Sequence, residues 1–222
     1  MAVKSQSSDI SESVLIPAGT VKLRGDLAVP DKATGLVVFA HGSGSSRLSP
    51  RNRAVARSLN ESGLATLLID LLDTQEEEMD HPTRRLRLDV QLLAERMVQI
   101  IDWLVLNEET KGMKIGLFGA STGAAAAIVA AGRRDKFVSA VVSRGGRPDL
   151  AADSLKELQA PTLLIVGGAD VDVLELNTKA QAQIQCANKL AVVAGATHLF
   201  PEKEALEEVT TLARDWFAKH LK

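Results

Sequence analysis

The chain has 222 residues, of which 45% are hydrophobic and 24% are charged, and its formal net charge is −2. This composition is that of a globular protein rather than of a disordered or membrane-embedded chain. Acidic and basic residues are interspersed, so no basic stripe is available for the phosphate backbone of nucleic acid. We expect neither nucleic acid nor a membrane as a partner. We also expect one domain over residues 1–222, with two small domains as the alternative.

Residues 1–12 form a polar segment that we expect to be poorly ordered. The segment lacks the apolar stretch of a secretory signal peptide. The single cysteine, Cys186, cannot form an internal disulfide. Both features predict a cytoplasmic protein, and the oligomeric state is left open between a monomer and a homodimer.

Short apolar runs alternate along the chain with longer stretches of helical period, which is typical of an α/β fold with helices on both faces of a mostly parallel sheet. The first two runs are joined by Pro17-Ala18-Gly19 and predict an antiparallel hairpin. The eight expected strands are Val14–Ile16, Val21–Val29, Gly35–Ala40, Ala65–Asp70, Lys114–Gly119, Phe137–Ser143, Pro161–Gly167 and Lys189–Val193. The expected helices are Arg51–Ser62, Pro82–Leu106, Thr122–Gly132, Val173–Gln183 and Glu202–Lys219.

The connections between these elements are short. Only residues 144–160 separate the sixth and seventh expected strands, which leaves no room for a cap domain. We therefore expect loops alone to cover a site at the sheet edge. Whether the segment Gln75–His81 closes over such a site as a mobile lid is left open.

A Gly-x-Ser-x-Gly sequence, Gly119-Ala120-Ser121-Thr122-Gly123, lies between an expected strand and an expected alanine-rich helix. In such a turn the serine is held in a strained conformation, and small residues two positions away on either side let the backbone close. The first N–H groups of the helix and its dipole face the place where an oxyanion forms. The sequence predicts Ser121 as a nucleophile and the Thr122 N–H as an oxyanion donor. A chance match in a loop would lack this context.

A serine hydroxyl needs an imidazole to take its proton and a carboxylate to orient that imidazole. With this turn, acid and base follow the serine in that order. Only His198 and His220 follow Ser121. His220 lies near the end of a charged helix and is expected to be solvated, so His198, after the last strand, is the predicted base. Asp170, after the seventh strand, is the predicted acid. Asp172 is the alternative acid and is otherwise expected to cap the next helix.

The loop His41-Gly42-Ser43-Gly44-Ser45-Ser46 follows the third expected strand. The second oxyanion donor comes from this loop when the serine lies in a strand-to-helix turn. We predict the Ser43 N–H as that donor, with Gly44 as the alternative, and a plain flexible loop as the weaker reading. His41 and Asp70 are expected to order loops by hydrogen bonding.

Several arginines lie close to the expected site in the sequence. Arg47, Arg51 and Arg53 follow the loop that contains Ser43, and Arg144 and Arg147 follow the sixth expected strand. Their default role is a solvated surface or ion pairs with the acidic residues of the 76–80 segment. The sharper hypothesis is that Arg144, at the carboxyl end of a strand, binds a substrate carboxylate or orders a loop.

Four motifs, HGSGSSRLSPRNR, GASTGA, VGGADVDV and GATHLF, occur in this order. Over about residues 20–220 the chain with these motifs resembles the dienelactone hydrolase-like branch of the α/β-hydrolases. The resemblance implies the α/β-hydrolase fold and a triad of Ser121, Asp170 and His198. The enzyme that names the branch has a cysteine nucleophile, so the serine here favours a general carboxylesterase. The first motif is also similar to hydrolase domains that are sometimes joined to a phosphoribosyltransferase, although no such second domain is expected here.

Together these residues predict a serine hydrolase that cleaves small carboxylic esters through an acyl-enzyme, with no metal and no organic cofactor. A thioesterase or a lactone hydrolase would use the same triad. A rival from another class is a binding module without catalysis, whose hydrolase site is vestigial. Because the triad is intact in the sequence, we favour the enzyme.

Overall fold

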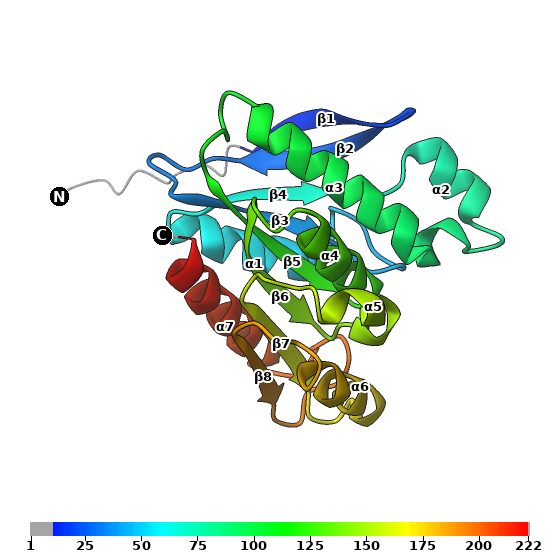
Figure 1. The fold of residues 1–222 in the computed structure, drawn as a ribbon, viewed down its shortest axis with the longest axis vertical. Coiled ribbons are helices and arrows are strands. Elements are labelled where there is room, and N and C mark those ends of the chain that lie inside the picture. Colours follow the sequence, from blue (N-terminus) through cyan, green and yellow to red (C-terminus); the bar gives the residue numbers. More distant parts are fainter. Residues whose placement is uncertain (1–10, 222) are drawn as a thin grey trace.

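The computed structural model describes residues 11–221. Of the segment 1–12 that is expected to be poorly ordered, residues 1–10 lie outside the described residues. Glu12 is the first residue of strand β1. One eight-stranded sheet runs through the described chain in the order β1-β2-β4-β3-β5-β6-β7-β8 (Figure 1). The strands are β1 (Glu12–Ala18), β2 (Val21–Ala28), β3 (Gly35–Ala40), β4 (Ala65–Ile69), β5 (Lys114–Ala120), β6 (Val138–Arg144), β7 (Thr162–Gly167) and β8 (Asn188–Val193). Strand β2 pairs antiparallel with β1 and β4, and the other neighbours are parallel. The predicted mostly parallel, eight-stranded α/β sheet is confirmed.

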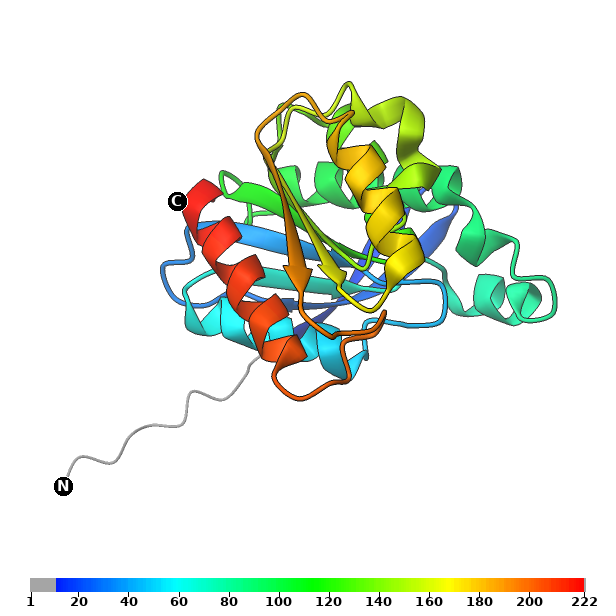
Figure 2. The same ribbon diagram turned by 90° about the horizontal axis from the view of Figure 1, so that it is seen from below.

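Helices cover both faces of the sheet. They are α1 (Pro50–Glu61), α2 (Thr74–Asp80), α3 (Val90–Leu106), α4 (Thr122–Arg133), α5 (Ala152–Leu155), α6 (Val171–Gln181) and α7 (Ala205–His220), with 3₁₀ turns η1 (Leu86–Leu88) and η2 (Pro148–Ala151). Figure 2 shows α1 and α7 side by side on one face. Residues of α3, α4, α5 and α6 pack into the core on the other face. Between β6 and β7 the described chain contains only η2 and α5.

The central strands are buried on both sides, which explains why they read as continuous apolar runs. All six residues of β3 are buried. Its successive side chains point to opposite faces, so Leu36 and Val38 join one core while Val37 and Phe39 join the other. The sheet therefore separates two cores, and the carboxyl ends of its parallel strands meet at one edge.

The predicted helix from Pro82 is wrong in its first part, because α3 begins only at Val90. The cause is the buried carboxylate of Asp80, which accepts hydrogen bonds from the backbone N–H groups of Leu86 and Arg87 and from Arg87 Nε. These bonds hold the chain in turns after α2. Asp89 then caps α3 by accepting from the N–H groups of Gln91 at 3.1 Å and Leu92 at 3.0 Å.

Helix α2 occupies most of the Gln75–His81 segment and was not predicted. Asp73 and Glu76 form a capping box at its start. The Glu76 carboxylate also accepts a hydrogen bond of 2.6 Å from Arg96 Nη2 of α3, and the Arg96 side chain is almost fully buried. These contacts oppose the movement that a lid would need.

No helix among residues 11–221 has the length and apolar character needed to cross a membrane.

Candidate active site

Ser121 lies directly after β5 and is the N-cap residue of α4, with φ 51° and ψ −121°. A positive φ is strained for a residue with a side chain and persists only where the surroundings impose it. Three backbone hydrogen bonds do so here. The Ser121 N–H donates to the Arg144 carbonyl at 3.2 Å, and the Ser121 carbonyl accepts from the N–H groups of Ala124 at 3.1 Å and Arg147 at 3.2 Å. Strand β6 and the loop after it therefore hold the serine turn in place.

The two glycines of the turn are required by close packing. A Cβ at Gly119 would lie 2.3 Å from Ala124 Cα, and a Cβ at Gly123 would lie 2.3 Å from the Ala40 carbonyl oxygen. Both positions face backbone, which cannot move aside. The Gly-x-Ser-x-Gly spacing thus lets α4 pack directly against the ends of β3 and β5.

His198 and Asp170 are in contact. His198 lies in the turn between β8 and α7, and its Nδ1 is 2.7 Å from Asp170 Oδ2. Asp170 is the N-cap residue of α6 but makes no side-chain capping bond. The expectation that Asp172 caps α6 is therefore wrong: α6 begins at Val171, and Asp172 is an exposed residue of its first turn.

Ser121 and His198 line the same cavity, which has a volume of about 280 Å³. It lies at the sheet edge where the carboxyl ends of the parallel strands meet. The structure therefore brings together the nucleophile and base predicted from the sequence, with the predicted acid behind the base. The lining residues are Gly42, Ser43, Gly44, Ser45, Arg51, Ala120, Ser121, Arg144, His198 and Leu199.

His220 does not line this cavity. Its ring is tilted by 53° against that of Trp216 with the centroids 4.7 Å apart, and its Nε2 is buried without a hydrogen-bond partner among the described residues. Burial and the nearby charge of Lys219 lower the pKa of His220. The expectation of a solvated His220 is only partly met, because its ring is half-buried against Trp216, one turn earlier on α7.

The two predicted oxyanion donors lie next to each other. The Ser43 N–H donates to Thr122 Oγ1 at 3.1 Å, so it already has an acceptor in the structure. The Thr122 N–H is in the first turn of α4, where backbone donors have no acceptor within the helix. Ser43 and Gly44 form the middle of a turn that the Ser45 N–H closes by donating to the Gly42 carbonyl at 3.0 Å. The oxyanion roles of Ser43, Gly44 and Thr122 stay predictions.

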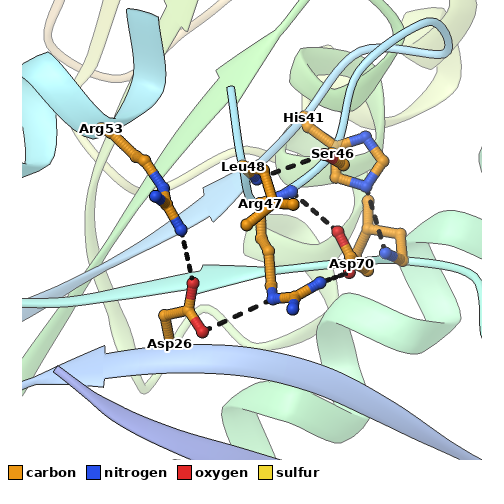
Figure 3. A network of polar contacts seen from close by, with 8 residues as sticks. Asp26, His41, Ser46, Arg47, Leu48, Arg53 and Asp70 are labelled. Carbon is orange, nitrogen blue, oxygen red and sulfur yellow. Dashed lines mark hydrogen bonds and ion pairs between the residues drawn. The ribbon is translucent and has the colours of Figure 1, made fainter. Parts of the chain in front are cut away.

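A polar network orders the loop that carries Ser43 (Figure 3). Asp70 accepts from the Arg47 N–H at 2.7 Å and from Arg47 Nη1 at 2.5 Å. Asp26 contacts Arg47 Nε at 3.4 Å and Arg53 Nη2 at 3.2 Å. Burial opposes the charge of Arg47, but the two carboxylates outweigh it and raise its pKa. The pairing of these arginines with the 76–80 acids is thus wrong, because Asp26 and Asp70 lie closer to them in the fold.

His41 contributes to the same loop. Its Nε2 accepts a hydrogen bond from the Leu71 N–H at 3.2 Å, and its Nδ1 lies 2.9 Å from the Gly42 carbonyl oxygen. An accepting Nε2 leaves the proton on Nδ1, which then donates to that carbonyl. His41 therefore links the ends of β3 and β4, in agreement with its expected role in ordering the loop.

Arg144 lies at the end of β6, and only 7% of its surface is exposed. Its guanidinium carbon lies 5.9 Å from the centre of the Phe200 ring. Burial, together with the charge of Arg51, lowers the pKa of Arg144 to about 10, so the guanidinium is still charged at pH 7. Arg51 also lines the cavity. The sequence did not indicate this position, because it depends on the direction in which α1 runs from the preceding loop.

Asn177 of α6 is a further residue near the site, and it was not predicted from the sequence. It is fully buried, and its Nδ2 donates to the carbonyls of Gly146 at 2.9 Å and Val173 at 2.8 Å. It thereby holds the loop whose Arg147 N–H bonds to the Ser121 carbonyl. A signal existed, because Asn177 is a polar residue four positions after the buried Val173 on the inner face of α6.

Comparison with known proteins places the chain in a family. The model of the dienelactone hydrolase family matches residues 23–221. The crystal structure of a dienelactone hydrolase from Anabaena variabilis ATCC 29413 is 54% identical, with a TM-score of 0.94, and the match covers 96% of this chain and 98% of that one. Est1E from Butyrivibrio proteoclasticus is 18% identical with a TM-score of 0.79 over 93% of this chain and 98% of its own, and supports the fold alone.

Two relatives from strains of Mycobacterium tuberculosis, each named "Putative phosphoribosyl transferase", are 55% identical over 210 residues. The matched region is 95% of this chain but 46% of each relative, so the chain spans about half of their length. With the family model matching nearly all of the described residues, the chain belongs to the dienelactone hydrolase family and has the α/β-hydrolase fold.

Proposed function

We propose that the protein is a serine hydrolase that cleaves small carboxylic esters through an acyl-enzyme on Ser121. One observation carries the proposal: the strained Ser121 and His198 line one cavity, while Asp170 lies 2.7 Å from His198 Nδ1. Membership of a hydrolase family supports the reaction class. This placement supports a triad in which Asp170 orients His198 and His198 activates the Ser121 hydroxyl.

The first half of the reaction forms the acyl-enzyme. Asp170 holds Nδ1 of His198, which leaves Nε2 to take the hydroxyl proton of Ser121 as its Oγ bonds to the ester carbonyl carbon. The carbonyl π electrons move to the oxygen, and the Thr122 N–H and an N–H of the Ser43–Gly44 turn stabilise this oxyanion. The intermediate collapses when the bond to the alcohol oxygen breaks, and protonated His198 gives its proton to that oxygen.

The second half releases the acid. A water molecule takes the place of the alcohol, and His198 removes its proton as the water oxygen bonds to the acyl carbon. The second intermediate breaks its bond to Ser121 Oγ, which regains the proton from His198. Asp170 stays ionised throughout and stabilises the imidazolium in each half.

The cavity limits the size of the substrate. A volume of about 280 Å³ lies just below the usual range for small-molecule sites, roughly 300–1,000 Å³. We therefore propose that short acyl groups are turned over best. A lactone hydrolase is the second candidate, since the structure that is 54% identical is named a dienelactone hydrolase. Phosphoribosyl transfer is not proposed for this chain, which covers 46% of the relatives with that name.

The proposal is tested by pre-steady-state hydrolysis of p-nitrophenyl acetate. The wild-type protein is expected to release a burst of p-nitrophenol that is stoichiometric with enzyme, and Ser121→Ala is expected to release none. A folded wild-type protein without a burst or turnover would indicate the vestigial binding module instead. A panel of matched oxygen esters, thioesters and lactones then separates the carboxylesterase from a thioesterase and a lactone hydrolase.

The cytoplasmic location, the small-molecule ester as the partner and the monomeric or homodimeric state stay predictions. So does the organisation of residues 1–222 as a single domain.

A further inference from the structure

Two guanidinium groups in the cavity of Ser121 and His198 lack an acidic partner. Arg51 and Arg144 both line this cavity, and the Nε of each is buried without a hydrogen-bond acceptor. Neither side chain forms an ion pair with any residue between 11 and 221. If a substrate of the function proposed for Ser121 also carries a charged group, that group would lie against these two arginines, and the inference rests on that proposed function.

The lack of a partner is specific to this cavity. Elsewhere in the described chain, arginines of comparable burial are paired: Arg47 with Asp70, Arg87 with Asp80, and Arg96 with Glu76. A buried cation costs free energy unless an anion and hydrogen bonds compensate it. In Arg51 and Arg144 that compensation is missing on the side of the cavity where a substrate would lie.

The contact of Arg144 with Phe200 does not supply it. An aromatic ring interacts with the flat face of a guanidinium, whereas the N–H donors point outward in the plane of the group. The in-plane donors of Arg144 thus still lack an acceptor. Among the described residues that line the cavity none is acidic, and Ser43, Gly44 and Ser45 add further donors.

The number of charges indicates the kind of anion. A single carboxylate would leave one of the two guanidinium charges uncompensated, whereas a dianion neutralises both. A phosphate group carries close to two negative charges at neutral pH and presents three terminal oxygens to two planar guanidinium groups. We propose that Arg51 and Arg144 form a subsite for a phosphate-type dianion, so that the substrate is a small ester that also carries a phosphate group.

Arg51 also sets where the phosphate group lies. Besides the cavity with Ser121, it borders two neighbouring cavities of about 560 and 610 Å³. Glu77 lines the first of these cavities and Glu202, Glu204 and Glu207 line the second, so the subsite lies on the side of Arg51 that faces Ser121, where no described lining residue is acidic. A substrate can place its ester at Ser121 and its phosphate between Arg51 and Arg144, which line the same cavity.

Three p-nitrophenyl esters of nearly equal length test the proposal: pentanoate is neutral, hemisuccinate carries one charge, and 3-phosphonopropionate carries two above its second ionisation. The rate with Ser121→Ala is subtracted as uncatalysed hydrolysis. We expect kcat/KM to be highest for the phosphonate, and its ratio to that of the pentanoate to fall about tenfold to a hundredfold in Arg51→Met and Arg144→Lys, the range for a lost charged hydrogen bond. Arg214→Met is the control, because Arg214 pairs with Asp215 on α7 and does not line the cavity.

A second measurement does not depend on hydrolysis. Inorganic phosphate is titrated into wild-type protein and Ser121→Ala and followed by ³¹P NMR, with saturable binding expected in both and its loss expected in Arg51→Met. If Arg144→Lys fails to fold, Arg51→Met carries the test, since Arg51 is only half-buried at the start of α1.

The outcomes separate this proposal from the function on which it rests. Equal kcat/KM for all three esters, or a hemisuccinate preferred over the phosphonate, would overturn the dianion subsite and leave the serine hydrolase standing. Absence of phosphate binding by wild type would also overturn it. Phosphate binding that is lost in Arg51→Met, in a protein that hydrolyses no ester, would support the subsite and contradict the proposed hydrolase.

Discussion

His198 Nδ1 lies 2.7 Å from Asp170 Oδ2, although the two residues come from turns after different strands, β8 and β7. The strands are parallel neighbours, so their carboxyl ends bring the two turns together. Because the carboxylate engages Nδ1, the other ring nitrogen is left to accept a proton, as the proposed mechanism requires of His198. The orientation of the imidazole is therefore set before a substrate binds.

Replacing Asp170 tests this arrangement. Asp170→Asn removes the charge that holds the imidazole and stabilises its protonated form, so we expect kcat to fall by roughly 10³–10⁴-fold with a small effect on KM. Asp172→Asn, two residues along in the exposed first turn of α6, is the matched control and is expected to keep near-normal activity. Steady-state kinetics with p-nitrophenyl acetate compare them. Loss of activity in Asp172→Asn but not in Asp170→Asn would mean that Asp172, and not Asp170, is the acid.

Asn177 is expected to support the site from behind. Asn177→Ala removes two buried hydrogen bonds to backbone carbonyls, so we expect a loss of about 1–3 kcal/mol in the free energy of unfolding and about tenfold in kcat. Asn188→Ala is the control, because its amide also donates to two carbonyls, at Ile184 and Cys186, but away from the cavity. Urea unfolding and kinetics measure both. Equal kcat losses in the two variants would mean that Asn177 acts through stability alone.

The loop that carries Ser43 depends on Asp70. Asp70→Asn weakens the hydrogen bonds to the backbone and side chain of Arg47, so we expect faster amide exchange over residues 43–47 and about a tenfold lower kcat/KM. Asp26→Asn, which leaves the bond to the Arg47 backbone intact, is expected to have the smaller effect. A larger loss in Asp26→Asn would show that the ion pairs, and not the backbone bond, order the loop.

Asp80 is expected to account for part of the loss of folding stability at acid pH. Burial acts to raise its pKa, but hydrogen bonds from Arg87 and from the Leu86 N–H outweigh burial and hold the pKa below its usual value. A carboxyl whose pKa is lower in the folded state stabilises the fold above its unfolded pKa of about 4, and this stabilisation is lost as the pH falls toward the folded value. Urea unfolding between pH 6 and pH 3 should therefore depend less on pH in Asp80→Asn. The exposed Asp153→Asn should retain the wild-type dependence; a wild-type slope in Asp80→Asn would contradict this.

The sequence predicted the strands and the site for one physical reason. Central strands of a parallel sheet are buried on both faces, so runs such as Gly35–Ala40 are apolar throughout. Since parallel strands end at the same edge, residues directly after those runs lie near one another whatever their separation in the sequence. Ser121, Asp170 and His198 could be grouped on that basis together with the Gly-x-Ser-x-Gly spacing and the order of acid and base after the serine.

Features that depend on three-dimensional packing could not be predicted in this way. The start of α3 is set by the buried carboxylate of Asp80, which competes for N–H groups that a helix would otherwise use. The approach of Arg51 to Arg144 depends on the direction of α1. The bond from Asn177 to Gly146 joins α6 to a loop on another strand. In each case the contacting residues are brought together by tertiary packing, and no local sequence pattern indicates the contact.

The most direct test of the central claim is covalent labelling with a fluorophosphonate, followed by peptide mass spectrometry. We predict a single adduct on the peptide that contains Ser121, absent in Ser121→Ala, strongly slowed in His198→Gln and formed at the normal rate in His220→Gln. A folded wild-type protein that is not labelled, or that is labelled at a residue other than Ser121, would contradict the assignment of Ser121 as the nucleophile.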